Sequence, residues 1–199
     1  MVTNKRSDTK QRILRAACEL LEREGISAVS IRRVAKKVQI SPMGIYNHFP
    51  SLEALLLAVY EAGVTTLARQ MWKELVRTDS PPRKLRALVR SYIKFGTQNP
   101  HYYSLLFGTE FIQKYLWDSP PRSLVMENFW LPFTEVIQAC QETGLIDSTL
   151  NPQEIATHLW ASMHGYVSFL IIGRLQQLWQ TDEESILKSM ERHLLPFLK

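Results

Sequence analysis

The sequence predicts an all-α fold of about nine helices. Apolar residues recur at three- and four-residue steps along most of the chain, which is the spacing of one face of an α-helix. Residues that favour helix starts, such as serine, asparagine and proline, stand just before these stretches, and no stretch alternates as a half-buried strand does. With 45% hydrophobic and 22% charged residues among 199, the composition is globular and excludes a largely disordered chain.

Three short helices are predicted in the first fifty residues. The first covers residues 8–24 and ends at Gly25, a natural C-terminal stop. The second begins after Ser30, which suits an N-cap, and the third begins at Ser41-Pro42, where serine at the N-cap and proline at the first helical position are favoured. The apolar face of the first helix consists of Ile13, Leu14, Ala17, Leu20 and Leu21.

Longer helices are predicted in the remainder of the chain. The fourth begins at Ser51 and extends to about residue 77. The letters Asp-Ser-Pro-Pro-Arg occur at 79–83 and again at 118–122, each time before an amphipathic stretch, which indicates repeated helix-start chemistry and not an internal repeat. Asn151-Pro152 predicts a further start, with Glu154 in the first turn facing the helix dipole.

The positive charge of the chain is concentrated at its beginning. Residues 1–50 hold ten Lys and Arg against four Asp and Glu, a balance of +6, whereas residues 51–199 hold fourteen against fifteen, a balance of −1. This asymmetry favours a head that binds a polyanion on a neutral body. A solvated basic surface without a partner is the alternative that composition alone leaves open.

The second and third helices predict a helix-turn-helix, because only residues 38–40 separate them. In that motif the second helix of the pair enters the DNA major groove. We expect Tyr46 and His48 to contact phosphates together with Arg32 or Arg33, while other residues of the third helix approach base edges. Three small packed helices with a charged surface are the alternative. The candidate DNA-binding residues are Ser30, Arg32, Arg33, Ser41, Pro42, Met43, Gly44, Tyr46, Asn47 and His48.

These residues resemble the N-terminal domain of TetR-family transcriptional regulators over about residues 8–57. The resemblance is carried by Ile13-Leu14-x-Ala16-Ala17, Glu24-Gly25, Ser30-Ile31-Arg32-x-x-Ala35, Ile40-Ser41, Ile45-Tyr46-Asn47-His48-Phe49 and Leu55-Leu56. It implies a homodimeric repressor of a palindromic double-stranded DNA operator, released by a small-molecule effector bound in the C-terminal domain. A weaker similarity, at Asn99-Pro100-x-Tyr102-Tyr103 and Trp160-x-x-x-His164-Gly165, resembles one C-terminal subtype marked by Trp…His-Gly.

Two positions depart from the family pattern. The turn carries Gln39 where the family usually has glycine, and a left-handed conformation there costs a glutamine about 1 kcal/mol. Leu52 stands where the family usually has a lysine that touches phosphate, so one phosphate contact per subunit is in doubt. The N-terminus of the fourth helix can still face an anion.

The C-terminal part is rich in aromatic residues that predict a pocket for an apolar or aromatic effector. Ordinary core packing explains any single one of them equally well, and His164 is either a polar group in the pocket or a satisfied core histidine. The candidate pocket residues are Phe95, Tyr103, Phe107, Phe111, Phe133, Trp160, His164 and Tyr166.

The last two long helices are the candidates for dimerisation through an isologous four-helix interface. Small residues such as Ala161, Ser162 and Gly165 favour close approach of helices. The alternative is that both helices cover the core of the monomer. The candidate interface residues are Ala156, Trp160, Met163, Val167, Leu170, Ile186, Met190 and Leu194.

These observations lead us to expect three parts: a DNA-binding domain at residues 1–50, a connecting helix at 51–77, and an effector-binding and dimerisation domain at 78–199. The connecting helix is expected to transmit the effector signal. An adaptor or architectural DNA-binding protein of the same fold, controlled by a protein partner, is the runner-up.

Other function classes find little support in the sequence. We expect no enzyme, metal or cofactor, because no nucleophile elbow, phosphate-cradling glycine loop or metal-ligand spacing occurs. Cys18 and Cys140 are expected to be buried free thiols. No membrane span is expected, since the longest apolar run, from Met163 to Gly173, is only eleven residues. A cytoplasmic location is expected because residues 1–15 are polar and basic and do not form a basic-then-apolar leader.

Overall fold

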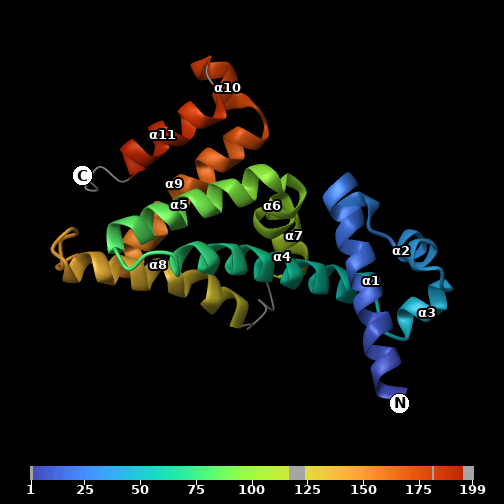
Figure 1. The fold of residues 1–199 in the computed structure, drawn as a ribbon. Coiled ribbons are helices and arrows are strands. Elements are labelled where there is room, and N and C mark those ends of the chain that lie inside the picture. Colours follow the sequence, from blue (N-terminus) through green and yellow to red (C-terminus); the bar gives the residue numbers. More distant parts are fainter. Residues whose placement is uncertain (1, 117–123, 181, 195–199) are drawn as a thin grey trace. The chain divides into compact units, whose positions relative to one another are not determined.

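The computed structural model describes residues 2–116, 124–180 and 182–194, and within them it confirms the all-α prediction. These residues form eleven α-helices and one 3-10 turn, without a strand (Figure 1). The elements are α1 (Val2–Glu24), η1 (Ile26–Ala28), α2 (Ile31–Val38), α3 (Pro42–Tyr46), α4 (Leu52–Leu75), α5 (Pro81–Gln98), α6 (Pro100–Phe107), α7 (Thr109–Tyr115), α8 (Leu124–Glu142), α9 (Pro152–Ile171), α10 (Arg174–Trp179) and α11 (Glu183–Leu194).

The predicted helix starts at Ser30, Ser41 and Asn151 are confirmed. The Ser30 side chain accepts a hydrogen bond from the Arg33 backbone N–H at 3.3 Å, and the Ser41 side chain accepts one from Gly44 at 3.1 Å. Asn151 accepts one from the Gln153 backbone N–H at 2.9 Å. Each cap satisfies a backbone donor that has no partner inside its own helix.

The boundaries differ from the predicted ones at three places. Helix α1 begins at Val2 and not at residue 8. Gly108 separates α6 from α7, and Gly173, with a φ of 69°, separates α9 from α10, so the helices outnumber the predicted nine. The predicted start at 118–122 lies outside the described residues.

The described residues divide into two compact units, and neither unit is continuous in sequence. The first combines residues 2–65 with residues 99–116, so α6 and α7 join α1, α2, α3 and the first part of α4. The second combines residues 66–98 with the helices that follow residue 123. The functional boundaries at residues 50 and 77 stay predictions.

The core of the first unit depends on close packing of α6 against α1 and α4. A Cβ atom on Gly63 would stand 2.8 Å from Cδ1 of Tyr102, so the glycine makes room for this ring. The Tyr102 side chain also shares a hydrogen bond with Cys18 of α1. Burial raises the pKa of the Cys18 thiol above its ordinary value. The fully buried side chains of this unit include Ile13, Val34, Ile45, Leu55 and Val59.

The core of the second unit lies between α5, α8 and α9, each of which packs against the other two. Tyr92, Phe95 and Phe133 are among its largest fully buried side chains. Burial raises the pKa of Cys140 on α8 to about 11, and both cysteines are free thiols. Among the described helices, none is long and apolar enough to cross a membrane.

Candidate nucleic-acid interface

The turn between α2 and α3 places Gln39 in the left-handed region, at φ 60° and ψ 46°. This residue is the C-cap of α2, and its backbone N–H points to the carbonyl oxygens of Ala35 and Lys36. The Ile40 N–H then donates to the Ala35 carbonyl at 3.1 Å. The turn therefore has the conformation for which glycine is best suited, although a glutamine occupies it.

Helix α3 presents its leading turn to solvent. Ile45 is fully buried and anchors the helix in the head, whereas 69% of Met43 and 45% of Tyr46 are exposed. Pro42 occupies the first helical turn and is exposed together with Asn47. Burial of one residue and exposure of its neighbours agree with a helix that packs on one side and faces a partner on the other.

The segment after α3 returns to the core at once. His48 is half-buried, its backbone N–H donates to the Ile45 carbonyl at 2.9 Å, and Phe49 is buried. The Ser51 hydroxyl accepts a hydrogen bond from the Ala54 N–H at 3.1 Å and caps α4. Leu52, the position in doubt for phosphate contact, is half-buried at the start of that helix.

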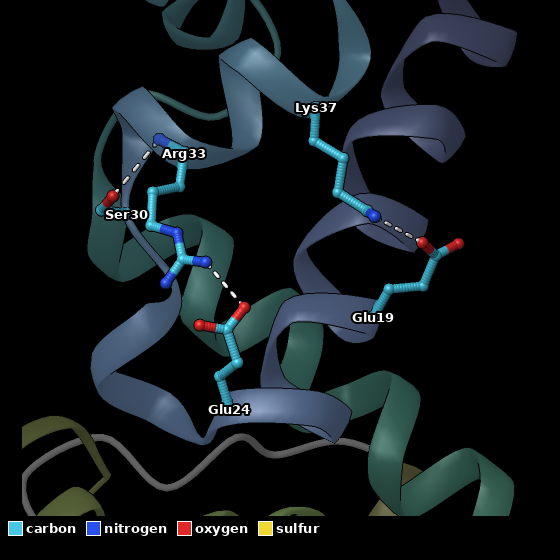
Figure 2. A network of polar contacts seen from close by, with 5 residues as sticks. All are labelled: Glu19, Glu24, Ser30, Arg33 and Lys37. Carbon is cyan, nitrogen blue, oxygen red and sulfur yellow. Dashed lines mark hydrogen bonds and ion pairs between the residues drawn. The ribbon is translucent and has the colours of Figure 1, made fainter.

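The four cations of α2 have two kinds of surroundings. Arg33 Nη2 lies 2.6 Å from Glu24 Oε1, and Lys37 Nζ lies 2.9 Å from Glu19 Oε2, so both are paired with carboxylates of α1 (Figure 2). Arg32 and Lys36 are exposed and make no ion pair with any described residue. The hydrogen bond from Arg33 lowers the pKa of Glu24, and the bond from Lys37 lowers that of Glu19, so both carboxylates are ionised at neutral pH.

The predicted effector-pocket residues are divided between the two units. Tyr103, Phe107 and Phe111 lie in the first, where the Tyr103 and Phe107 ring centroids are 4.9 Å apart. The other five lie in the second unit: Phe95, Phe133, Trp160, His164 and Tyr166.

Three of the residues in the second unit form an aromatic cluster with Trp130 and Tyr92. The Trp160 ring stacks on His164 at 5.4 Å between centroids and meets Trp130 edge-on at 5.4 Å. Trp130 also lies 6.3 Å from Phe133. The Tyr92 hydroxyl and His164 Nδ1 are 3.4 Å apart, and burial lowers the pKa of His164, which favours its neutral imidazole at pH 7.

A hollow of about 320 Å³ opens in the second unit between the end of α4, the start of α5, and α8. The sequence analysis did not assign these residues to the pocket, although Trp72 belongs to the connecting helix that is expected to transmit the effector signal. The hollow combines an indole with apolar and charged groups, and it is lined by Trp72, Leu75, Val76, Asp79, Lys84, Glu135, Val136 and Ala139.

Most of the predicted interface residues are buried in the chain's own core. Ala156, Met163, Val167 and Ile186 are fully buried and Leu170 nearly so. Trp160 is half-buried, and the side chains of Met190 and Leu194 lie outside the described residues.

A different face of α9 is exposed. Ala161, Ser162 and Phe169 lie on it, and a Cβ atom on Gly165 would meet nothing within 4 Å. Half of Phe169 and 64% of Ile172, which follows the helix, are open to solvent. This face has the small residues that permit close helix approach and two large apolar side chains beside them.

Within the described part of the chain, no group of three or more His, Cys, Asp or Glu residues could hold a metal ion. His158, six residues before His164, is exposed on α9.

Comparisons with known families and proteins agree with this geometry. Residues 13–59 match the family model described as "Bacterial regulatory proteins, tetR family", and residues 85–194 match "Tetracyclin repressor-like, C-terminal domain". The uncharacterized HTH-type transcriptional regulator YobS of Bacillus subtilis is 32% identical over 95 residues, which are 48% of this chain and 49% of YobS. The chain thus spans about half the length of this curated relative. Nucleoid occlusion factor SlmA of Marinobacter nauticus is 24% identical over 88% of this chain and 86% of its own.

Solved structures share the fold. A putative TetR-family transcriptional regulator from Rhodococcus sp. superposes with a TM-score of 0.71 at 22% identity, covering 96% of each chain. The regulator FadR from Bacillus subtilis, solved in complex with stearoyl-CoA, superposes with a TM-score of 0.67 at 13% identity, covering 94% of this chain and 96% of FadR. The Trp…His-Gly subtype stays a prediction, since the matched C-terminal model does not name it. The two family models together span most of the described helices, and the chain belongs to the TetR family of DNA-binding transcriptional regulators.

Proposed function

We propose that this chain works as a homodimeric repressor that binds a palindromic operator and leaves it when a small apolar or aromatic effector binds. The observation that carries the DNA-binding part is the capped, outward-facing α3 beside an α2 with two exposed cations, Arg32 and Lys36, that make no ion pair with a described residue. Phosphate contacts fix the position of a protein on DNA, and contacts to base edges select the sequence.

The roles of the side chains follow from their exposure. Tyr46 and Arg32 hold phosphates, and the half-buried His48 offers an imidazole to the same backbone. Met43 and Asn47 lie at the exposed surface of α3 and approach base edges. Tyr46→Phe removes a donor to phosphate, so affinity should fall by a similar factor on every sequence, with the preferred site unchanged.

The DNA test compares site preference and affinity. Selection of bound sequences from a random DNA pool gives the preferred site of the wild type and of Tyr46→Phe, and fluorescence anisotropy gives both affinities. We expect a palindrome with half-site centres about 34–36 Å apart or a multiple of this distance. A changed site preference in Tyr46→Phe would show that Tyr46 reads bases.

The proposed dimer uses the exposed face of α9. Small residues around Gly165 let two helices approach, and Phe169 and Ile172 supply the apolar contact. Phe169→Glu should give a folded monomer with poor operator affinity, because two copies of the charge would meet at an isologous interface. Leu150→Glu, at a half-exposed leucine outside α9, is the matched control and should remain dimeric in light scattering. A dimeric Phe169→Glu variant would refute this interface.

The effector part of the proposal is supported by the aromatic cluster around Trp160 and by the hollow at Trp72. It is also supported by FadR, which has the same fold and was solved with stearoyl-CoA. If the effector weakens operator binding tenfold, it must itself bind tenfold less tightly to the DNA complex, a coupling of about 1.4 kcal/mol.

The effector test is calorimetric titration with stearoyl-CoA and with a small phenol as probes, with and without operator DNA. Weaker ligand binding in the presence of operator is the expected result. Equal affinities for a ligand that binds would refute induced release. The runner-up, an adaptor controlled by a protein partner, would then be favoured, and the similarity to a relative named nucleoid occlusion factor, SlmA, is consistent with it.

A further inference from the structure

The cations of α2 form two rows that differ in what they contact. Arg33 and Lys37, four residues apart, lie one turn from each other and are both paired with α1. Arg32 and Lys36 form the neighbouring row, which is open to solvent. All of these residues belong to the first unit, and Figure 2 shows the two paired side chains reaching from α2 toward α1.

The carboxylates of Glu24 and Glu19 compete with DNA phosphates for Arg33 and Lys37. A carboxylate and a phosphate offer arginine the same bidentate arrangement of acceptor oxygens, so Arg33 cannot serve Glu24 and a phosphate equally well. Both pairs are partly exposed: 46% of the Arg33 side chain and 48% of the Glu24 side chain are accessible, as are 33% of Lys37 and 52% of Glu19. Exposed pairs are weak and sensitive to salt, so a polyanion can compete with them, but at a cost to its own binding.

We infer that Glu19 and Glu24 are positioning residues that limit DNA affinity by withholding Lys37 and Arg33 from the phosphates. Arg32 and Lys36 are then the α2 cations that meet the backbone. The inference rests on the proposed placement of α2 along the phosphates. It predicts that removing either carboxylate adds a phosphate contact, whereas a simple bracing role would predict that removal loosens α2 and weakens binding.

Salt dependence separates these possibilities, because each cation that neutralises a phosphate steepens the fall of log affinity with log salt by about 0.9. Between 50 and 200 mM salt, one released cation therefore adds about a 3.5-fold loss of affinity. A purely structural change alters the affinity or the thermal stability, but it does not change the number of counterions released from the DNA, so the salt slope stays the same.

The variants are Glu24→Gln and Glu19→Gln in the full chain, with Glu22→Gln as the matched control. Glu22 is exposed on the same helix and makes no ion pair with a described residue. Its substitution by glutamine removes the same charge as the other two variants do. Affinity for a random-sequence duplex is measured by fluorescence anisotropy across a salt series, and circular dichroism follows the unfolding midpoint. Glu24→Gln and Glu19→Gln should each steepen the slope and raise affinity at low salt, while Glu22→Gln keeps the wild-type slope.

Arginine variants complete the cycle. In the wild-type background, Arg33→Gln should leave the slope of log affinity against log salt unchanged. In the Glu24→Gln background, Arg33→Gln should return the steeper slope to the wild-type value. Weaker binding in Glu24→Gln, an unchanged slope, or an equal effect of Glu22→Gln would overturn the inference. Arg32→Gln tests the proposed placement of α2 separately: it should lower the slope by about 0.9, and an unchanged slope there would refute the placement itself.

Discussion

Replacing Gln39 with glycine should stabilise the first unit, because the backbone already has a left-handed conformation that glycine adopts without the steric cost of a Cβ atom. The residue lies at φ 60° and ψ 46°, and its side chain is exposed. The substitution therefore removes no buried contact and leaves the backbone hydrogen bonds of the turn in place. The change in the free energy of unfolding should come almost entirely from the backbone.

Two opposing effects set the magnitude. The left-handed conformation costs a residue with a Cβ atom about 1–2 kcal/mol, and glycine is relieved of that cost. Glycine also has more conformations in the unfolded chain, which costs roughly 0.5–1 kcal/mol on folding. The net gain is about 0.5–1 kcal/mol, which for a chain of this length raises the unfolding midpoint by about 1–4 °C.

The assay is thermal and urea unfolding followed by circular dichroism, with Gln39→Ala as the control. Alanine loses the same side-chain atoms but keeps the Cβ, so it should show no comparable gain. Gln180, at φ 50°, offers an independent site in the second unit where Gln180→Gly should act in the same direction. Equal stability of the glycine and alanine variants at position 39 would refute the reasoning.

Three further predictions concern caps, packing and pH. Ser41→Ala should cost about 1 kcal/mol, because the Gly44 N–H loses its acceptor, and hydrogen exchange at that amide should accelerate. Gly63→Ala should destabilise the chain by about 1 kcal/mol in urea unfolding, since the clash with Tyr102 outweighs the gain in helix propensity. The pKa of His164 is lowered by burial, so the unfolded chain binds the proton more tightly. Stability should therefore be complete above about pH 6.5 and decline as pH falls toward the lowered pKa. His164→Gln should flatten this decline in unfolding midpoints measured across that range, whereas His158→Gln, at an exposed residue, should leave it unchanged.

Local features of the head could be predicted from the sequence because they depend on residues a few positions apart. A serine that caps a helix contacts an N–H three residues later, so Ser30 and Ser41 were recognisable in the sequence. The family resemblance then allowed the whole helix-turn-helix, and not only its caps, to be predicted. The conformation of Gln39 was anticipated only as a cost, and the structure shows that the turn keeps the left-handed geometry.

Features that depend on distant residues were not predictable in the same way. Arg32 and Arg33 are adjacent, and only the position of Glu24 on α1 decides which of them is paired. Likewise, the period of α9 marks Met163 as apolar and inward-facing, but it does not say whether the same chain or a second copy covers it. The structure shows that the chain's own core covers Met163, and that Phe169 is a large apolar residue left exposed on another face of the helix.

The entry of α6 and α7 into the first unit has a consequence for how the protein is made. The core of the first unit contains Tyr102 packed against Gly63 and bonded to Cys18, so it is incomplete until the second segment of that unit has been synthesised. At about 5–20 residues per second, the 33 residues between Thr65 and Asn99 alone delay that step by roughly 2–7 s. During this interval α1 and the first part of α4 expose the apolar surface that α6 later covers. A ribosome-bound chain stopped before α6 should accordingly be more sensitive to protease in α1 than one stopped after α7.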